Sequence, residues 1–156
     1  IRHVKIENCV LGGRQNAIYI KSREGRGGYM EDISGDNLTI LKSPTFIGID
    51  LLKKGIQATD PVPGDVEKWP RVRNLSFTNI RVQDVTRLVA ATNIPKERPL
   101  DGFALADISG ACARGVSLAN MTNVNLSKIN LTGFSGPLVT TENVQGTGLD
   151  YPSAGK

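Results

Sequence analysis

A five-residue pattern, apolar-x-apolar-x-Asn, recurs along this chain at intervals of roughly 30 or 40 residues. Its copies end at Asn8, Asn37, Asn79 and Asn120, and the copy before Asn37 is weakened by Gly35 in its second apolar position. Alternating apolar residues are typical of a short strand with one buried face, and Asn tolerates the unusual backbone angles of a turn. A strand and turn that recur without helical periodicity favour a solenoid, in which each unit covers the core of the next.

The composition supports a turn-rich all-β architecture. The chain has 17 glycines and 8 prolines, and its best helix candidate, residues 49–56, reads equally well as a strand and a turn. The dense leucine consensus of leucine-rich repeats is absent. We therefore predict an all-β parallel β-helix, with residues 1–145 as the C-terminal coils of a single domain and residues 146–156 as a frayed polar tail. Because Ile1 falls inside an expected strand, we expect the domain to be incomplete at its N-terminus.

The net charge of +4 and the sequence pI near 9.2 have two interpretations. They could simply favour solubility, or they could attract a polyanion. The basic residues are scattered, are not interleaved with aromatic residues and form no zinc-finger, RNA-recognition or helix-turn-helix signature, so we predict no nucleic-acid partner. A polyanionic sugar polymer matches the positive charge of the chain as well as a nucleic acid would. No stretch is long and apolar enough to span a membrane, and we expect a monomer.

The two cysteines, Cys9 and Cys112, are predicted to be free. A disulfide needs Cα atoms within about 7 Å, whereas successive layers of a solenoid are about 4.8 Å apart. Cysteines several layers apart cannot meet, and we interpret both as buried thiols. The chain has one His and no Cys-x-x-Cys motif, so the sequence predicts no metal site and no cofactor.

Asn-x-Ser/Thr sequons are frequent in this sequence and have two interpretations. They could be glycosylation sites. They could also be a by-product of placing Asn at turns beside Ser or Thr in strands, and we favour this second interpretation. The sequons begin at Asn37, Asn74, Asn120, Asn125 and Asn130.

The clearest candidate binding residues lie on the alternating segment 17–21. Ile18 and Ile20 would enter the core of a β-helix, which leaves Tyr19 and Lys21 side by side on the outer face, about 6 to 7 Å apart along the strand. A Tyr ring can pack on the apolar face of a sugar, and a Lys ammonium can pair with a sugar carboxylate. The pair therefore suits an anionic sugar, although an exposed strand with ordinary polar residues has the same pattern.

Residues 16–22, Asn-Ala-Ile-Tyr-Ile-Lys-Ser, followed by Gly-Arg-Gly-Gly at 25–28, resemble the Arg-Ile-Lys segment of glycoside hydrolase family 28, the polygalacturonase-like pectinases. The run 1–8 resembles the strand that precedes this segment. The resemblance implies a right-handed parallel β-helix and inverting hydrolysis of galacturonide linkages in pectic polysaccharide by a secreted or periplasmic enzyme. It implies that Lys21 anchors a substrate carboxylate, with Tyr19 and Arg26 as further substrate contacts.

The sequence departs from that family at two places. Tyr19 stands where the family has Arg, and Tyr cannot hold a carboxylate with two hydrogen bonds. Carboxylate recognition could therefore be weaker, or the subsite could take a different sugar, as in rhamnogalacturonan or a substituted galacturonan. The family's catalytic aspartates and His precede the Arg-Ile-Lys segment, whereas no matching motif precedes Tyr19 and His3 does not fit the His motif. Inverting hydrolysis needs two carboxyl groups, so we expect the catalytic acids in N-terminal coils outside this chain, which alone should be inactive.

Other charged residues near Lys21 have competing interpretations. Arg23 and Arg26 could extend an anionic subsite or lie in a solvated turn. The acidic residues of the next coils could approach the same sheet, but they are more simply turn residues or solvated charges; they are Glu31, Asp32, Asp36 and Asp50.

Three functions stay open. The first is a fragment of a family-28-like hydrolase, and the second is a non-catalytic carbohydrate-binding or adhesive β-helix. The third is a lyase on the same scaffold, which ranks last because such lyases usually use calcium and no clustered carboxylates here indicate a calcium site.

Overall fold

The computed structural model describes residues 1–53, 57–60 and 65–151, which form parallel strands and one short 3-10 helix. The described residues contain no α-helix, which confirms the all-β prediction. No helix among them is long and apolar enough to cross a membrane. The elements are β1 (Arg2–Glu7), β2 (Val10–Gly12), β3 (Asn16–Arg23), β4 (Tyr29–Leu41), β5 (Thr45–Lys53), the 3-10 helix η1 (Asp65–Lys68), β6 (Arg71–Asn93), β7 (Leu100–Thr132) and β8 (Val139–Thr147).

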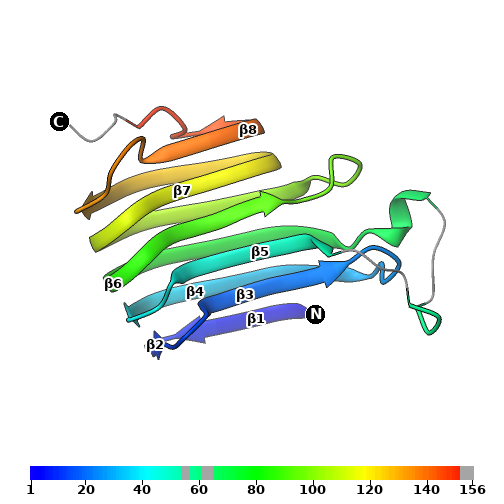
Figure 1. The fold of residues 1–156 in the computed structure, drawn as a ribbon, viewed down its shortest axis with the longest axis horizontal. Helices are drawn as coiled ribbons and strands as arrows, with labels where there is room; N and C mark the ends of the chain where they lie inside the picture. The colour runs from blue at the N-terminus through cyan, green and yellow to red at the C-terminus, as the bar shows by residue number, and fades with distance from the viewer. Residues whose placement is uncertain (54–56, 61–64, 152–156) are drawn as a thin grey trace.

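The strands join into one eight-stranded sheet in which each pairing between strands is parallel. The long strands bend along their length, so the first part of β6 pairs with β4 and a later part pairs with β5. The sheet is therefore curled, and Figure 1 shows the strands stacked from β1 at one end to β8 at the other. This confirms the prediction of stacked parallel strands.

The strands bend at residues with left-handed backbone, and many of these residues stack in two columns. Asn and Asp adopt this conformation more readily than other non-glycine residues. A strand of four residues separates the columns, so the recurring sequence pattern is a short strand ended by a left-handed bend. The first column holds His3, Asp32, Asn74 and Gly102, with φ of 54°, 55°, 55° and 84°, and the second holds Asn8, Asn37, Asn79 and Asp107, with φ of 54°, 51°, 54° and 55°.

Side-chain amides bond one layer to the next along these columns. Asn37 Nδ2 donates to Asn8 Oδ1 at 2.7 Å, and Asn74 Nδ2 donates to Asp32 Oδ1 at 2.8 Å. Asn120, at a bend outside these two columns, donates from its Nδ2 to the carbonyl oxygen of Ile94 at 2.7 Å. The sequon asparagines among these residues thus have a structural role, which supports our interpretation of the motif.

Asn120 ends a short strand at a left-handed bend, with φ of 53°, but it lies in a different column from Asn8, Asn37 and Asn79. Val116, four residues earlier, pairs with Val89 and Val139, and Asn143 donates to Asn120 Oδ1 at 2.8 Å. Asn120 therefore bends the chain in another column, and Asp107 occupies the next place in the Asn8 column. The same five-residue pattern ends strands at two different bends.

Alternate residues of each short strand fill a core inside the curled sheet. A row of aromatic rings runs through this core, because Phe46 contacts Phe77 edge to face at 5.8 Å between ring centroids and Phe77 lies 6.5 Å from Phe103. All three side chains are buried. Offset and edge-to-face aromatic pairs favour such distances.

Three smaller predictions have mixed outcomes. The 49–56 segment is a strand up to Lys53, and the rest lies outside the described residues. The last strand continues to Thr147, which pairs with Asn125, so β8 extends two residues into the predicted tail, and Tyr151 beyond it packs against the core. Both cysteines are free, but only Cys112 is buried; Cys9 is half-buried, so the prediction of a buried thiol there is wrong.

Candidate functional site

Strand β3 presents Tyr19 and Lys21 on the outer face of the sheet, as predicted. Ile18 and Ile20 are buried in the core, whereas Tyr19 and Lys21 are both exposed. The Lys21 Nζ lies 5.6 Å from the centroid of the Tyr19 ring. An aromatic surface and a positive charge thus stand side by side, and such groups can contact the apolar face and the carboxylate of an anionic sugar.

Asp50 joins this pair from the neighbouring strand. It is the register partner of Lys21, and the Tyr19 hydroxyl donates to Asp50 Oδ2 at 3.3 Å. The alternative that Asp50 approaches the same sheet is therefore confirmed, and the interpretation of Asp50 as a turn residue is wrong. A signal existed, because the alternating segments 17–21 and 46–50 align and bring Asp50 beside Lys21.

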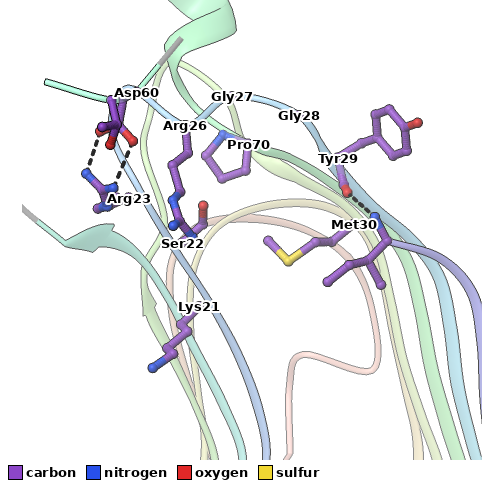
Figure 2. A pocket seen from close by; sticks show the side chains of 12 residues that line it. Lys21, Ser22, Arg23, Arg26, Gly27, Gly28, Tyr29, Met30, Asp60 and Pro70 are labelled. Atoms are coloured by element: carbon purple, nitrogen blue, oxygen red, sulfur yellow. Dashed lines mark hydrogen bonds and ion pairs between the residues drawn. The ribbon is translucent and has the colours of Figure 1, made fainter. Parts of the chain in front are cut away.

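Lys21 and Arg26 line one pocket of about 570 Å³, whose opposite side is formed by Tyr29 and Met30 (Figure 2). The Arg26 side chain extends from its loop toward Ser22. Tyr19 does not line the pocket and stays on the outer face. The structure thus brings two of the three predicted binding residues into one pocket and leaves the third outside it.

The glycine-rich loop that carries Arg26 is held against the segment before β6. The backbone N–H groups of Gly25 and Gly27 both donate to the carbonyl oxygen of Lys68, at 2.9 and 3.1 Å. The Lys68 Nζ lies 3.0 Å from Glu24 Oε1. Gly25 and Gly27 have φ of 87° and 55°, a region that favours glycine. The loop sequence therefore places Arg26 at the rim of the pocket.

Arg23 forms an ion pair, so the interpretation of Arg23 as part of a solvated turn is wrong, although Arg23 does line the pocket with Lys21 and Arg26. Its guanidinium donates to Asp60 Oδ1 at 2.8 Å and to Gln57 Oε1 at 2.9 Å, and the Arg23 and Asp60 side chains are largely buried. The backbone N–H of Gln57 lowers the pKa of Asp60, and Arg23 lowers it further against the opposing effect of desolvation. Asp60 is therefore held as a carboxylate by groups that leave it little freedom to act as an acid.

Glu31 also differs from its sequence interpretation, because it is buried and is not a solvated charge. Three arginines surround its carboxylate: Arg71 Nε at 2.7 Å, Arg73 Nε at 3.1 Å and Arg2 Nε at 3.2 Å. Desolvation raises the pKa of Glu31, but the hydrogen bond from Arg71 and the three positive charges lower it by more. Glu31 is thus a structural anion that links β1, β4 and β6.

Of the other acidic candidates, Asp32 is a turn residue, as expected, whereas Asp36 is a strand residue next to the bend at Asn37. Asp32 occupies a left-handed bend and lies 3.3 Å from His3 Nδ1, measured from Oδ2. Asp36 accepts a hydrogen bond from Asn79 Nδ2 at 2.8 Å. Both carboxylates support the bends and lie away from the pocket lining.

The described residues contain no group of three or more His, Cys, Asp and Glu side chains that could hold a metal ion. The chain matches no protein-family model, no curated protein and no solved structure.

Proposed function

We propose that this chain forms a right-handed parallel β-helix that binds an acidic polysaccharide, as part of a polygalacturonase-like glycoside hydrolase of family 28. The parallel pairing of successive strands supports the architecture, and parallel crossover connections are almost always right-handed. The proposed substrate is a galacturonan or rhamnogalacturonan of pectin, met by a monomeric protein outside the cell or in the periplasm.

One observation carries the binding proposal. Lys21 and Arg26 line the same pocket, and the Tyr19 ring lies next to Lys21 on the adjoining surface. Two cations at one pocket attract carboxylates, and Arg26 offers the two-pronged hydrogen bonding that Tyr19 cannot supply. In this proposal Lys21 and Arg26 bind sugar carboxylates and Tyr19 supports the apolar face of a neighbouring sugar ring.

A second candidate function is carbohydrate binding without catalysis. Hydrolysis with inversion needs two carboxyl groups about 6.5 to 9.5 Å apart, one of them free to give a proton. The acid that lines this pocket and the acid paired with Lys21 on the next strand are otherwise engaged, because Asp60 binds Arg23 and Asp50 accepts from Tyr19. This favours binding as the role of this chain, with catalytic acids supplied by other residues in the hydrolase version.

Binding of trigalacturonate to this chain, measured by calorimetry, tests the proposal. Lys21→Ala should weaken binding about tenfold, which corresponds to about 1.4 kcal/mol and to the loss of a charge-assisted hydrogen bond. Lys96→Ala removes an exposed lysine from a loop and serves as the control. Equal affinity of the two variants would remove Lys21 from the site. Release of reducing ends by this chain would contradict the assignment of catalysis to other residues.

A further inference from the structure

A second basic site lies where β6 and β7 run side by side. Arg87 of β6 and Arg114 of β7 are register partners, so their side chains start about 4.8 Å apart on adjacent strands. Like charges directly opposite on neighbouring strands are destabilising. This arrangement therefore costs stability unless a negative group lies between the two guanidinium groups.

The other clustered arginines of the described chain have that negative group. Three arginines surround Glu31, and Arg23 binds Asp60. In contrast, no hydrogen bond or ion pair joins the guanidinium of Arg87 or Arg114 to any described residue. This arginine pair thus lacks a partner within the part of the chain that the structure describes.

The arginine pair opens onto a pocket of about 160 Å³. The hydroxyl-bearing residues Ser117, Ser135 and Thr140 line it, and none of its described lining residues is acidic. Glu142 lies two positions beyond Thr140 on β8 and does not line the pocket. The lining thus offers hydrogen-bond donors and positive charge, which together suit an anion.

Backbone contacts hold the walls of this pocket in place. The Val116 N–H donates to the carbonyl oxygen of Leu138 at 2.8 Å, and the Ser135 N–H donates to that of Ala113 at 3.2 Å. A Cβ atom added to Gly115 would stand 2.0 Å from the Leu138 carbonyl oxygen, so the two segments are in close contact. The pocket is therefore built before any ligand arrives.

We propose that Arg87 and Arg114 form an oxyanion-binding site for a carboxylate, sulfate or phosphate group. The planar guanidinium presents parallel N–H donors that match such groups, and the hydroxyls of Ser117 and Thr140 add further donors. The pocket has room for about five water molecules, enough for one such group. Its binding neutralises the repulsion between the two arginines.

The group could be a free ion or part of a polymer. A continuous row of register partners runs from Tyr19 through Gly48 and Ala90 to Ser117 and Thr140. Tyr19 and Ser117 are three strand spacings apart, about 14 Å. A polysaccharide with several carboxylates could therefore contact both sites, but the oxyanion site does not depend on the function proposed for Lys21.

Nuclear magnetic resonance titrations of this chain with inorganic phosphate, inorganic sulfate and trigalacturonate test the proposal. At least one probe should shift the amide signals of Ser117 and Thr140, and Arg114→Gln should weaken that binding at least tenfold. Arg81→Gln, which removes an exposed arginine elsewhere on β6, should leave it unchanged. Without an anion, Arg114→Gln should unfold at the same or a higher temperature than the unmodified chain, because it removes a repulsion.

The outcomes separate the sources of the anion and can overturn the site. Binding of phosphate or sulfate without trigalacturonate assigns the site to a free ion, and trigalacturonate binding that Arg114→Gln weakens assigns it to an acidic polymer. The proposal is overturned if no probe shifts Ser117 or Thr140, or if Arg114→Gln and Arg81→Gln affect binding equally. Loss of trigalacturonate binding in Lys21→Ala alone bears only on the function proposed for Lys21.

Discussion

The ring of Phe77 occupies the space that a side chain at Gly35 would need. The two residues are register partners on β6 and β4, and a Cβ atom added to Gly35 would stand 2.7 Å from Phe77 Cδ1. The Cδ1 atom of Leu38 would be 2.9 Å away. The weakened copy of the sequence pattern thus has a physical reason, because the glycine makes room for the central ring of the aromatic row.

Gly35→Ala should destabilise the protein by about 1 to 3 kcal/mol, the usual cost of overpacking a core. The added methyl group would force Phe77 or Leu38 to move, and both are fully buried. Urea denaturation measures the change. Ser34→Ala, at the adjacent half-buried position, is the control and should change the free energy of unfolding by less than about 0.5 kcal/mol. Equal effects of the two substitutions would show that this space is not tightly filled.

The local sequence pattern predicted the short strands but did not predict which strands pair with one another. Alternation and terminal Asn identified the short strand before each bend at Asn8, Asn37 and Asn79, because both properties depend on neighbouring residues. The pattern also identified the bend at Asn120 but not the column to which it belongs, and it missed Asp107, because Asp serves at a left-handed bend as well as Asn does. Register depends on contacts between distant segments, and a pattern of five residues does not specify them.

The left-handed bend at Asn79 predicts a difference between two substitutions. Asn79→Ala should cost about 1 to 2 kcal/mol, because its φ of 54° places a Cβ atom in an unfavourable conformation and the bond to Asp36 is lost. Asn79→Gly loses the same bond without the conformational strain and should cost less. Thermal and urea denaturation of both variants provide the measurement.

Asn125→Ala is the control for that comparison, because Asn125 is exposed and does not have a left-handed backbone. It should have little effect on stability. If Asn79→Gly were as costly as Asn79→Ala, the backbone angle would not be the reason for Asn at this bend.

The buried carboxylate of Glu31 predicts a loss of stability in acid. The folded protein holds the pKa of Glu31 below its ordinary value of 4.5, so the unfolded chain binds the proton more readily. The contribution of Glu31 is complete above pH 4.5 and is lost as the pH falls through the lower pKa of the folded state. Glu31→Gln should lower stability at pH 7, because three arginines lose their counter-charge, and should reduce the change in stability between pH 5 and pH 3.

Urea denaturation at several pH values checks this prediction, with the exposed Glu97→Gln as the control. Asp60 has a pKa lowered in the same direction, so Glu31→Gln should retain part of the acid sensitivity. A Glu31→Gln protein with an unchanged pH profile would contradict the role given to this carboxylate.

The positions of site residues were predictable where the alternation of side chains along a strand determines which of them face outward. Ile18 and Ile20 had to face the core, so Tyr19 and Lys21 had to face outward. The ion pair of Arg23 with Asp60 and the burial of Glu31 had no comparable signal, because each depends on residues brought together from distant parts of the chain. From a single sequence, a charged residue is expected to be exposed to solvent, because the partners that would bury it are not known.

Asp50 should weaken the binding of anionic sugars at Lys21, because it is the register partner of Lys21 and carries the opposite charge. Asp50→Asn removes that charge while it keeps an oxygen that can accept from the Tyr19 hydroxyl. The affinity for trigalacturonate should therefore rise by up to about fivefold, which corresponds to the 0.2 to 1 kcal/mol of an exposed charge pair. Calorimetry at low and high salt measures the change, which should shrink as salt screens the charges.

Asp150→Asn removes an exposed charge near the end of the described chain and should have no effect. A decrease in affinity in Asp50→Asn would instead make the Asp50 carboxylate part of the sugar-binding surface.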